Sequence, residues 1–176
     1  PFQHPQEDGT VRARWAVVRN SYRELQDTTI ATWRDWVPSH YSNWVASDMK
    51  DVLRFRDKDD GQAYEIEVLF RALDRPDDVK KLLSLELTGA WLNEAREIPK
   101  AIFDAVQGRL GRYPKERKGW FGLILDTNPP DDDHWIYRIF EEAKPEGHAI
   151  FRQPSGLDPA AENIENLPPQ YYQRMM

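Results

Sequence analysis

The chain has 176 residues with 40% hydrophobic content and a formal net charge of −6, so it can bury one sizeable core and is expected to form one domain. Seven Trp, seven Tyr and seven Phe exclude intrinsic disorder, although 31% of the residues are charged. No apolar run is long enough to cross a membrane, the absence of Cys excludes disulfides and thiolate metal sites, and the acidic balance leaves nucleic-acid contact to a local basic patch at most.

The first elements expected along the chain are a strand and a helix. Residues 1–10 are polar and turn-rich and are expected to be flexible. Residues 12–20 are a short β-rich run closed by a polar pair, which predicts a strand. The segment Ser21-Tyr-Arg-Glu24 has the capping-box pattern that begins a helix, and this helix should continue until Pro38. Residues 39–47 are predicted to form a loop.

A β-hairpin is expected next. Apolar and charged residues alternate over 52–57 and 63–70, and the segment Asp57-Lys-Asp-Asp-Gly61 between them contains the Gly of a turn. Residues 75–83 should form a short helix, because the acids near its start and the Lys near its end suit the helix dipole. The apolar run 85–92 then predicts a strand that is buried within a sheet.

The second half of the chain continues this alternation of strands and helices. Pro99 begins a predicted helix whose apolar residues repeat on one face and which ends near Gly108. The elements expected after it are a loop at 112–118, a strand at 120–125, a helix from Pro129, a strand at 148–152, a loop at 154–166 and, within 154–176, the start of a truncated helix.

The order of these elements predicts the fold class. Strands that alternate with helices are typical of an α/β protein with a mainly parallel sheet, and the hairpin adds one antiparallel pair. In such a sheet, the polar side chains at the carboxyl ends of the strands form the functional edge. The candidates for chemistry are therefore the residues that directly follow the predicted strands.

Two of the predicted strands end abruptly in polar residues. Asn93 and Glu94 follow one strand, and Asp126-Thr127-Asn128 follows the next. Nucleotide hydrolases commonly present a metal-associated acid and a water-orienting carboxylate after such a strand, which makes Glu94 a candidate base, whereas Asn93 replaces the first acid. The alternative is structural, because Asn93 and Glu94 could cap the next turn and Asn128 could cap a helix. The residues alone leave both interpretations open.

Other polar groups have weaker patterns. The run Asp131-Asp-Asp-His134 could suggest a metal site, but consecutive acids on a helix point to different sides, and acids at the start of a helix are the better explanation. The four His residues have no metal-ligand spacing, so no metal ligands are predicted. The sequence has no Gly-x-x-x-x-Gly-Lys-[Ser/Thr] loop, so this chain alone is not expected to bind ATP productively.

One basic concentration occurs in this acidic chain, between residues 109 and 118. A loop of this kind could contact DNA phosphates, and a solvated loop explains the charges equally well. The candidate DNA-binding residues are Arg109, Arg112, Lys115, Arg117 and Lys118.

Three stretches form a recognisable combination: Trp15-Ala-Val-Val-Arg-Asn-Ser-Tyr-Arg-Glu-Leu, the block from Ala72 to Pro99 that contains Thr-Gly-Ala-Trp-Leu-Asn-Glu, and Asp126-Thr-Asn-Pro-Pro-Asp-Asp-Asp-His-Trp. With them, the chain resembles the large terminase subunit of tailed bacteriophages from about Val11 to its end. The resemblance implies a P-loop ATPase motor domain of the additional-strand type, followed in that family by a metal-dependent nuclease domain. Such motors drive double-stranded DNA into an empty procapsid, and the nuclease cuts the concatemers.

The resemblance also implies roles for residues that match by position. Glu94 corresponds to the catalytic glutamate that activates water, and Asn93 occupies the place of the usual metal-associated aspartate. Thr127 and Asn128 match the coupling motif that links hydrolysis to DNA movement. Arg19 lies where the family has an arginine near the nucleotide. The candidates for an arginine finger that reaches the next subunit are Arg75, Lys80 and Lys81.

The resemblance further implies that the sequence is part of a longer protein. The phosphate-binding loop would precede Pro1 and the nuclease domain would follow Met176, so residues 1–176 would be an incomplete motor domain in which 15–19 borders a strand outside this sequence. The whole protein would bind ATP and Mg²⁺, and neither is expected on this fragment. Its expected partners are double-stranded DNA, the portal protein, the small terminase subunit and further copies in a ring, in the cytoplasm of the bacterial host. The alternative is a non-catalytic prophage remnant, or a module that binds DNA or a partner through the basic loop.

Overall fold

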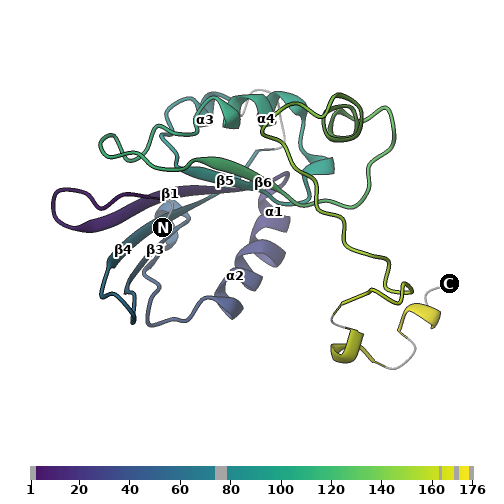
Figure 1. Ribbon diagram of the computed structural model, residues 1–176, viewed down its shortest axis with the longest axis horizontal. Coiled ribbons are helices and arrows are strands. Elements are labelled where there is room, and N and C mark those ends of the chain that lie inside the picture. The colour runs from purple at the N-terminus through teal and green to yellow at the C-terminus, as the bar shows by residue number, and fades with distance from the viewer. Residues whose placement is uncertain (1–2, 74–78, 163, 169–170, 175–176) are drawn as a thin grey trace. The chain divides into compact units, whose positions relative to one another are not determined.

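The computed structural model describes residues 3–73, 79–162, 164–168 and 171–174 (Figure 1). The chain divides into two compact units, Pro1–Asp131 and Asp132–Met176. The first unit contains a six-stranded sheet with the strand order β2-β3-β4-β1-β5-β6. The strands are β1 (Thr10–Arg19), β2 (Trp44–Val45), β3 (Lys50–Arg56), β4 (Ala63–Ala72), β5 (Gly89–Leu92) and β6 (Gly122–Leu125).

The centre of the sheet is parallel, and one edge is antiparallel. β4, β1, β5 and β6 pair in parallel, whereas β3 pairs antiparallel with β4 and β2 pairs antiparallel with β3. The predicted mainly parallel sheet with one antiparallel hairpin is therefore confirmed. The β3–β4 turn requires glycine at Gly61, because its φ of +71° would strain any residue with a side chain.

Helices cover both faces of this sheet (Figure 1). On one face, a helical segment runs through α1 (Tyr22–Glu24), the π-helical turn Leu25–Ile30 and α2 (Ala31–Trp36). It begins as predicted, because the Ser21 side chain accepts a hydrogen bond from the backbone N–H of Glu24 at 3.3 Å. On the other face lie α3 (Val79–Leu82) and α4 (Lys100–Gln107), and Pro99 precedes α4 as predicted.

Strand β1 contributes to the core on both faces of the sheet, because successive side chains of a strand point in opposite directions. Val17 packs under the α1–α2 segment with Leu25, Ile30, Val68 and Phe70. The neighbouring residues of β1 face the side that α3 and α4 cover. The buried residues of this second layer include Ala16, Val18, Ala90, Leu92, Ile102, Phe103 and Val106.

Gly89 in β5 has no room for a side chain, and Gly89→Ala is expected to destabilise the protein by about 1–3 kcal/mol. A Cβ atom at this position would lie 2.7 Å from the Trp15 ring, which also stacks on Trp120 at a centroid distance of 6.2 Å. Trp15 would have to leave this stacking arrangement. Urea unfolding of the 176-residue chain measures the change in the free energy of unfolding.

Gly108→Ala is the matched control for this substitution. Gly108 follows α4 with a φ of −66°, and a Cβ there would meet its nearest atom at 3.5 Å, an ordinary contact distance. This variant should stay within about 0.5 kcal/mol of the unaltered chain. Equal destabilisation by both variants would contradict the steric explanation for Gly89.

Several expectations about individual strands and helices are wrong. The predicted loop at 39–47 contains β2, whose two residues are too few for a periodic pattern. The helix expected from Pro129 begins only at Trp135, because His134 is its N-cap: His134 Nδ1 accepts a hydrogen bond from the Ile136 N–H at 3.2 Å. The segment 148–152 is not a strand.

A further correction concerns the edges of the parallel sheet. Residues 15–19 were expected to border a strand outside this sequence, but β4 and β5 occupy both sides of β1. Within the described residues, β6 pairs with β5 alone. The free edge of the parallel sheet is therefore β6 and not β1.

The second unit contains little regular structure. It begins with α5 (Trp135–Tyr137), which continues as the π-helical turn Arg138–Ala143, and Arg152 forms an ion pair with Glu141. The predicted loop at 154–166 is largely confirmed, and its last residues form the 3₁₀ turn Ile164–Asn166. The helix expected near the chain end corresponds to one 3₁₀ turn, Tyr172–Arg174. Within the described residues, every helix falls short of the length and apolar character that crossing a membrane requires.

Candidate functional site

Three strands deliver polar residues to one edge of the sheet. β1 ends at Arg19, β5 is followed by Asn93, and β6 is followed by Asp126. The register of β5 and β6 pairs Leu92 with Leu125, so Asn93 and Asp126 are neighbours. Parallel strands bring their carboxyl ends to the same edge, and this is where the sequence predicts the functional residues.

Glu94 follows this edge in a left-handed backbone conformation, with φ of 52° and ψ of 56°. The conformation costs a residue with a side chain about 1–3 kcal/mol, and such strain occurs frequently at functional sites. Glu94 is half-buried, and no described residue donates a hydrogen bond to its carboxylate or forms an ion pair with it. The carboxylate is therefore available to accept a hydrogen bond from a water molecule.

Asn93 connects two elements and does not offer a free oxygen to the edge. Its side-chain Nδ2 donates to the two carboxylate oxygens of Asp126 at 3.2 and 3.0 Å, and its Oδ1 accepts from Thr29 Oγ1 at 2.7 Å. Because an ionised carboxylate can only accept, the NH₂ group of Asn93 must face Asp126. Thr29 is buried in the π-helical turn, so Asn93 joins this helical segment to the end of β6.

Asp126 has the largest number of partners at this edge, although the sequence assigns it no separate role. Its carboxylate accepts hydrogen bonds from Trp91 Nε1, from Asn93 Nδ2 and, at 3.4 Å, from the backbone N–H of Glu94. Its backbone oxygen accepts from the Ala95 N–H at 2.9 Å. Knowledge of the β5–β6 register could have identified Asp126, because that register places residue 126 beside residue 93.

Thr127 binds the same turn, and Asn128 does not cap a helix. Thr127 Oγ1 accepts a hydrogen bond from the Arg96 N–H at 3.2 Å and donates to the Asn128 backbone oxygen at 3.0 Å. The alternative that Asn128 is an N-cap is wrong, because His134 caps the next helix. Asn128 is exposed beside the strand ends.

Arg19 is almost buried, with 8% of its surface exposed, and its contacts are long. Its guanidinium donates to the Asn93 backbone oxygen at 3.4 Å and lies 3.5 Å from the Glu97 carboxylate and 3.9 Å from that of Glu24. Its Nε has no hydrogen-bond partner among the described residues. The contact with Asn93 places the Arg19 cation beside the end of β5.

The remaining basic candidates are less well placed. Arg75 lies outside the described residues, as does the side chain of Lys81, and Lys80 is exposed on α3. In the basic loop, Arg109 is half-buried and donates to the Leu83 backbone oxygen at 2.8 Å, which favours a structural role. The exposed members of this loop are Arg112, Lys115, Arg117 and Lys118, of which Arg117 donates to the Pro5 oxygen at 3.2 Å and Lys115 lies 4.0 Å from Glu86.

The acidic run before α5 consists of one paired acid and two exposed acids. Asp131 pairs with Arg96 at 2.9 Å, and Asp132 and Asp133 are exposed. Among the residues that the structure describes, no three His, Asp or Glu side chains converge as metal binding requires. These acids also precede the helix and are not part of its first turn, contrary to the prediction.

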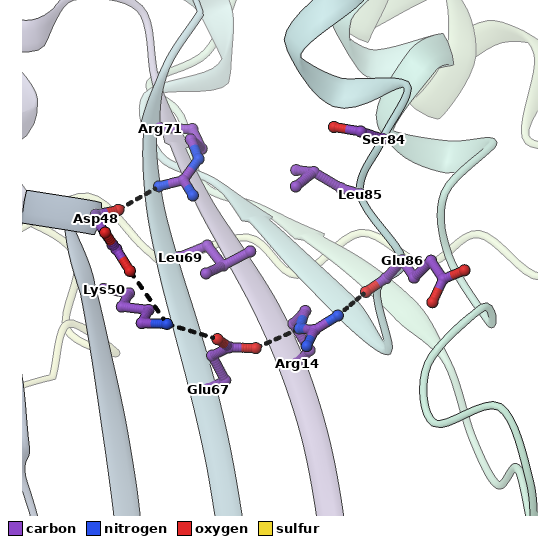
Figure 2. A pocket seen from close by; sticks show the side chains of 9 residues that line it. All are labelled: Arg14, Asp48, Lys50, Glu67, Leu69, Arg71, Ser84, Leu85 and Glu86. Carbon is purple, nitrogen blue, oxygen red and sulfur yellow. Dashed lines mark hydrogen bonds and ion pairs between the residues drawn. The ribbon is translucent and has the colours of Figure 1, made fainter. Parts of the chain in front are cut away.

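A pocket of about 370 Å³ lies on the face of the sheet formed by β1, β3 and β4 (Figure 2). Lys50 links Asp48 at 3.3 Å and Glu67 at 3.4 Å, and Glu67 in turn pairs with Arg14. Arg71 donates to backbone oxygens, and its partial burial lowers the pKa of its guanidinium. The charges in this pocket neutralise one another. The better candidate for chemistry is therefore the edge where β1, β5 and β6 end, which we call the strand-end site.

Comparison with known proteins identifies a family that this chain matches. The family model described as phage terminase large subunit matches residues 17–158. The large terminase of a thermophilic bacteriophage has 13% identity and a TM-score of 0.57, over 75% of this chain and 30% of the terminase chain. The same terminase in complex with ADP gives 13% identity and a TM-score of 0.56, over 77% and 32% of the two chains.

The likeness to these solved structures shows the fold, since the identity is low. The chain spans about a third of the length of that terminase, and no curated protein sequence matches it. The family match covers Asn93 and Glu94, the segment 126–128 and most of the sheet. The chain therefore belongs to the phage terminase large subunit family.

Proposed function

We propose that this chain is part of the ATP-driven motor that packages double-stranded DNA into procapsids, and that Glu94 is its catalytic base. One observation carries the assignment of Glu94. At the sheet edge where β1, β5 and β6 end, its backbone is left-handed and its carboxylate has no partner among the described residues. A general base needs such a carboxylate, because it must be free to take a proton from the attacking water.

The neighbouring groups suit a nucleotide phosphate. Arg19 would face the phosphate as a cation and stabilise the charge that develops when the terminal phosphoryl group passes to water. Glu94 would accept the proton of that water, and the products would be ADP and inorganic phosphate. Thr127 and Asn128 would couple hydrolysis to movement of the rest of the motor, because Thr127 is hydrogen-bonded to the turn that follows Glu94.

Nucleotide hydrolysis by such motors uses Mg²⁺, and the carboxyl groups at the described strand ends are those of Glu94 and Asp126. Mg²⁺ prefers oxygen ligands from one or two carboxylates together with nucleotide phosphates. Asn93 directs its oxygen to Thr29, and the Asp126 carboxylate is surrounded by hydrogen-bond donors. Asn93 and Asp126 therefore do not fit a directly bound Mg²⁺ ion, which leaves Glu94 as the unpaired carboxylate of the described strand ends that could approach one.

The partners follow from the same proposal. The motor would act on double-stranded DNA at the portal protein, together with the small terminase subunit, as a ring of identical chains in the host cytoplasm. Within such a ring, Arg75, Lys80 or Lys81 would reach the site of the next subunit as an arginine-finger equivalent. ATP would bind with help from a phosphate-binding loop, which this sequence does not contain.

DNA-stimulated ATP hydrolysis by the protein expressed from the complete reading frame tests the proposal. We expect hydrolysis that rises on addition of double-stranded DNA, and a phosphate-binding loop encoded upstream of residue 1. A protein that hydrolyses no ATP with or without DNA would show that the motor assignment is wrong. Retained DNA binding in such a protein would support the alternative of a non-catalytic DNA-binding module.

The exposed basic loop should carry part of the DNA affinity. Reversing the charges of Arg112, Lys115 and Lys118 to Glu is expected to weaken DNA binding at low salt, because fewer counterions are released when fewer phosphates are neutralised. The slope of log K against log salt concentration should become less negative by about 0.9 for each phosphate that the loop no longer neutralises. Fluorescence anisotropy with a labelled duplex at several salt concentrations measures both quantities.

A second triple variant separates the position of these charges from the net charge. Arg23, Lys58 and Lys100 are exposed and lie outside the loop, so their reversal to Glu changes the net charge equally. This control should leave the salt slope unchanged. If both triple variants weaken DNA binding equally, the loop is not part of the DNA-binding surface.

A further inference from the structure

Three consecutive backbone N–H groups after β5 are bound by the two residues that follow β6. Glu94 N–H donates to the Asp126 carboxylate at 3.4 Å, Ala95 N–H to the Asp126 backbone oxygen at 2.9 Å, and Arg96 N–H to Thr127 Oγ1 at 3.2 Å. These groups begin the 3₁₀ turn Ala95–Glu97, whose own N-cap residue forms no side-chain cap. The turn is therefore capped from the neighbouring strand, and we call Asp126 and Thr127 the strand-end clamp.

The carboxylate of Asp126 accepts several hydrogen bonds in this arrangement. Three donor groups share this carboxylate: Trp91 Nε1, Asn93 Nδ2, which contacts both oxygens, and the Glu94 N–H. Its partners are all neutral donors from the end of β5 and the residues after it. Several donors on one carboxylate are typical of a group that holds a structure in place.

We propose that Asp126 is the positioning residue of the hydrolytic site: it holds the end of β5 so that Glu94 keeps the left-handed backbone from which its carboxylate is presented. This inference rests on the proposed function of Glu94. The left-handed conformation is unfavourable for a residue with a side chain, and Asp126 restrains the chain on both sides of Glu94: its carboxylate holds Asn93 Nδ2 at 3.0 Å, and its backbone oxygen holds the Ala95 N–H at 2.9 Å. Without Asp126, the turn would relax, and the Glu94 carboxylate would no longer be held in the position from which it activates water.

The clamp also gives the coupling motif a physical route to the base. Asp126 and Thr127 hold the turn that carries Glu94 through adjacent backbone groups, so a displacement of residues 126–128 must move that turn. This route needs no ligand contact by the clamp itself. It therefore predicts an effect on the rate of the chemical step and not on nucleotide affinity.

The test uses Asp126→Asn, which keeps the size of the side chain but replaces one acceptor oxygen by an NH₂ group. In the protein from the complete reading frame, kcat for ATP hydrolysis should fall at least about 10-fold, while KM for ATP stays within about threefold. Amide hydrogen exchange at Glu94 in the 176-residue chain should become at least about 10-fold faster. Asp132→Asn is the matched control, since Asp132 is exposed and outside the clamp, and it should change neither quantity.

The double variant Asn93→Asp with Asp126→Asn distinguishes positioning from the supply of negative charge. It restores the charge and the bond between the two side chains, but Asn at position 126 has one acceptor oxygen, whereas Trp91 Nε1 and the Glu94 N–H bind different oxygens of Asp126 and cannot both keep an acceptor. The proposal expects this variant to remain as slow as Asp126→Asn. Recovery to the activity of the unaltered protein would show that charge matters and would overturn the positioning role.

The other outcomes separate this inference from the function on which it rests. If Glu94→Gln abolishes hydrolysis while Asp126→Asn stays within about threefold of the unaltered protein, the clamp is irrelevant to catalysis and the proposed function stands. If the unaltered protein hydrolyses no ATP, the proposed function fails first. Unchanged exchange at the Glu94 amide in Asp126→Asn would overturn the clamp irrespective of any activity.

Discussion

Replacing Glu94 by Gln is expected to lower kcat for DNA-stimulated ATP hydrolysis about 10²- to 10⁴-fold, which is the usual contribution of a general base. Gln has nearly the same size and should keep the left-handed backbone at this position, but its amide cannot take a proton from water. KM for ATP should remain within about threefold, because Glu94 is assigned to the water and not to the nucleotide. Steady-state kinetics of the protein from the complete reading frame measures both constants.

Glu7→Gln is the matched control for this experiment, since Glu7 is exposed and far along the chain from the strand ends. It removes the same charge and should leave both constants unchanged. If Glu94→Gln keeps kcat within about threefold of the unaltered protein, Glu94 is not the base. The structural alternative, in which Asn93 and Glu94 belong only to the turn after β5, would then be the better explanation.

The convergence of the strand ends was predictable from the sequence. Apolar runs that stop at Asn93 and at Asp126 predict parallel strands, and parallel strands place their carboxyl ends at one edge. The structure confirms this edge and brings Arg19 to it. The prediction succeeded because it needed only local patterns and one general property of parallel sheets.

The partners within that edge were not predictable, because they depend on the register between strands. The sequence does not show that residue 126 lies beside residue 93, so the contacts of Asp126 with Asn93 and Trp91 could not be inferred. The bond from Thr29 to Asn93 joins residues 64 positions apart and also depends on the helix path. The convergence of these strand-end residues was thus predictable, whereas their hydrogen-bond network was not.

Local signals failed where a competing cap or an edge position decided the structure. Pro129 and the acids after it suggest a helix start, yet His134 provides the cap and the helix begins at Trp135. The segment 148–152 has a β-rich composition, but Ile150 and Phe151 are exposed and no described strand pairs with them. Composition indicates a tendency to form a strand, and a partner strand is needed to realise it.

Asp51 is a buried polar residue that holds the antiparallel edge of the sheet together through hydrogen bonds. Asp51 lies in β3 with 1% of its surface exposed. Its carboxylate accepts hydrogen bonds from Trp33 Nε1 at 2.9 Å and from Ser42 Oγ at 2.8 Å. These donors come from α2 and from the segment before β2, so one carboxylate joins a helix, a loop and a strand. A buried polar group of this kind must keep its partners.

Asp51→Ala is expected to destabilise the 176-residue chain by about 2–4 kcal/mol, because two donors lose their acceptor and each buried unsatisfied group costs about 1–3 kcal/mol. Asp51→Asn should cost less than about 1 kcal/mol, since its oxygen can accept from Trp33 and its NH₂ group can donate to the Ser42 hydroxyl. Urea unfolding followed by tryptophan fluorescence gives both values. Equal destabilisation by Ala and Asn would mean that the negative charge, and not the pair of hydrogen bonds, holds this edge together.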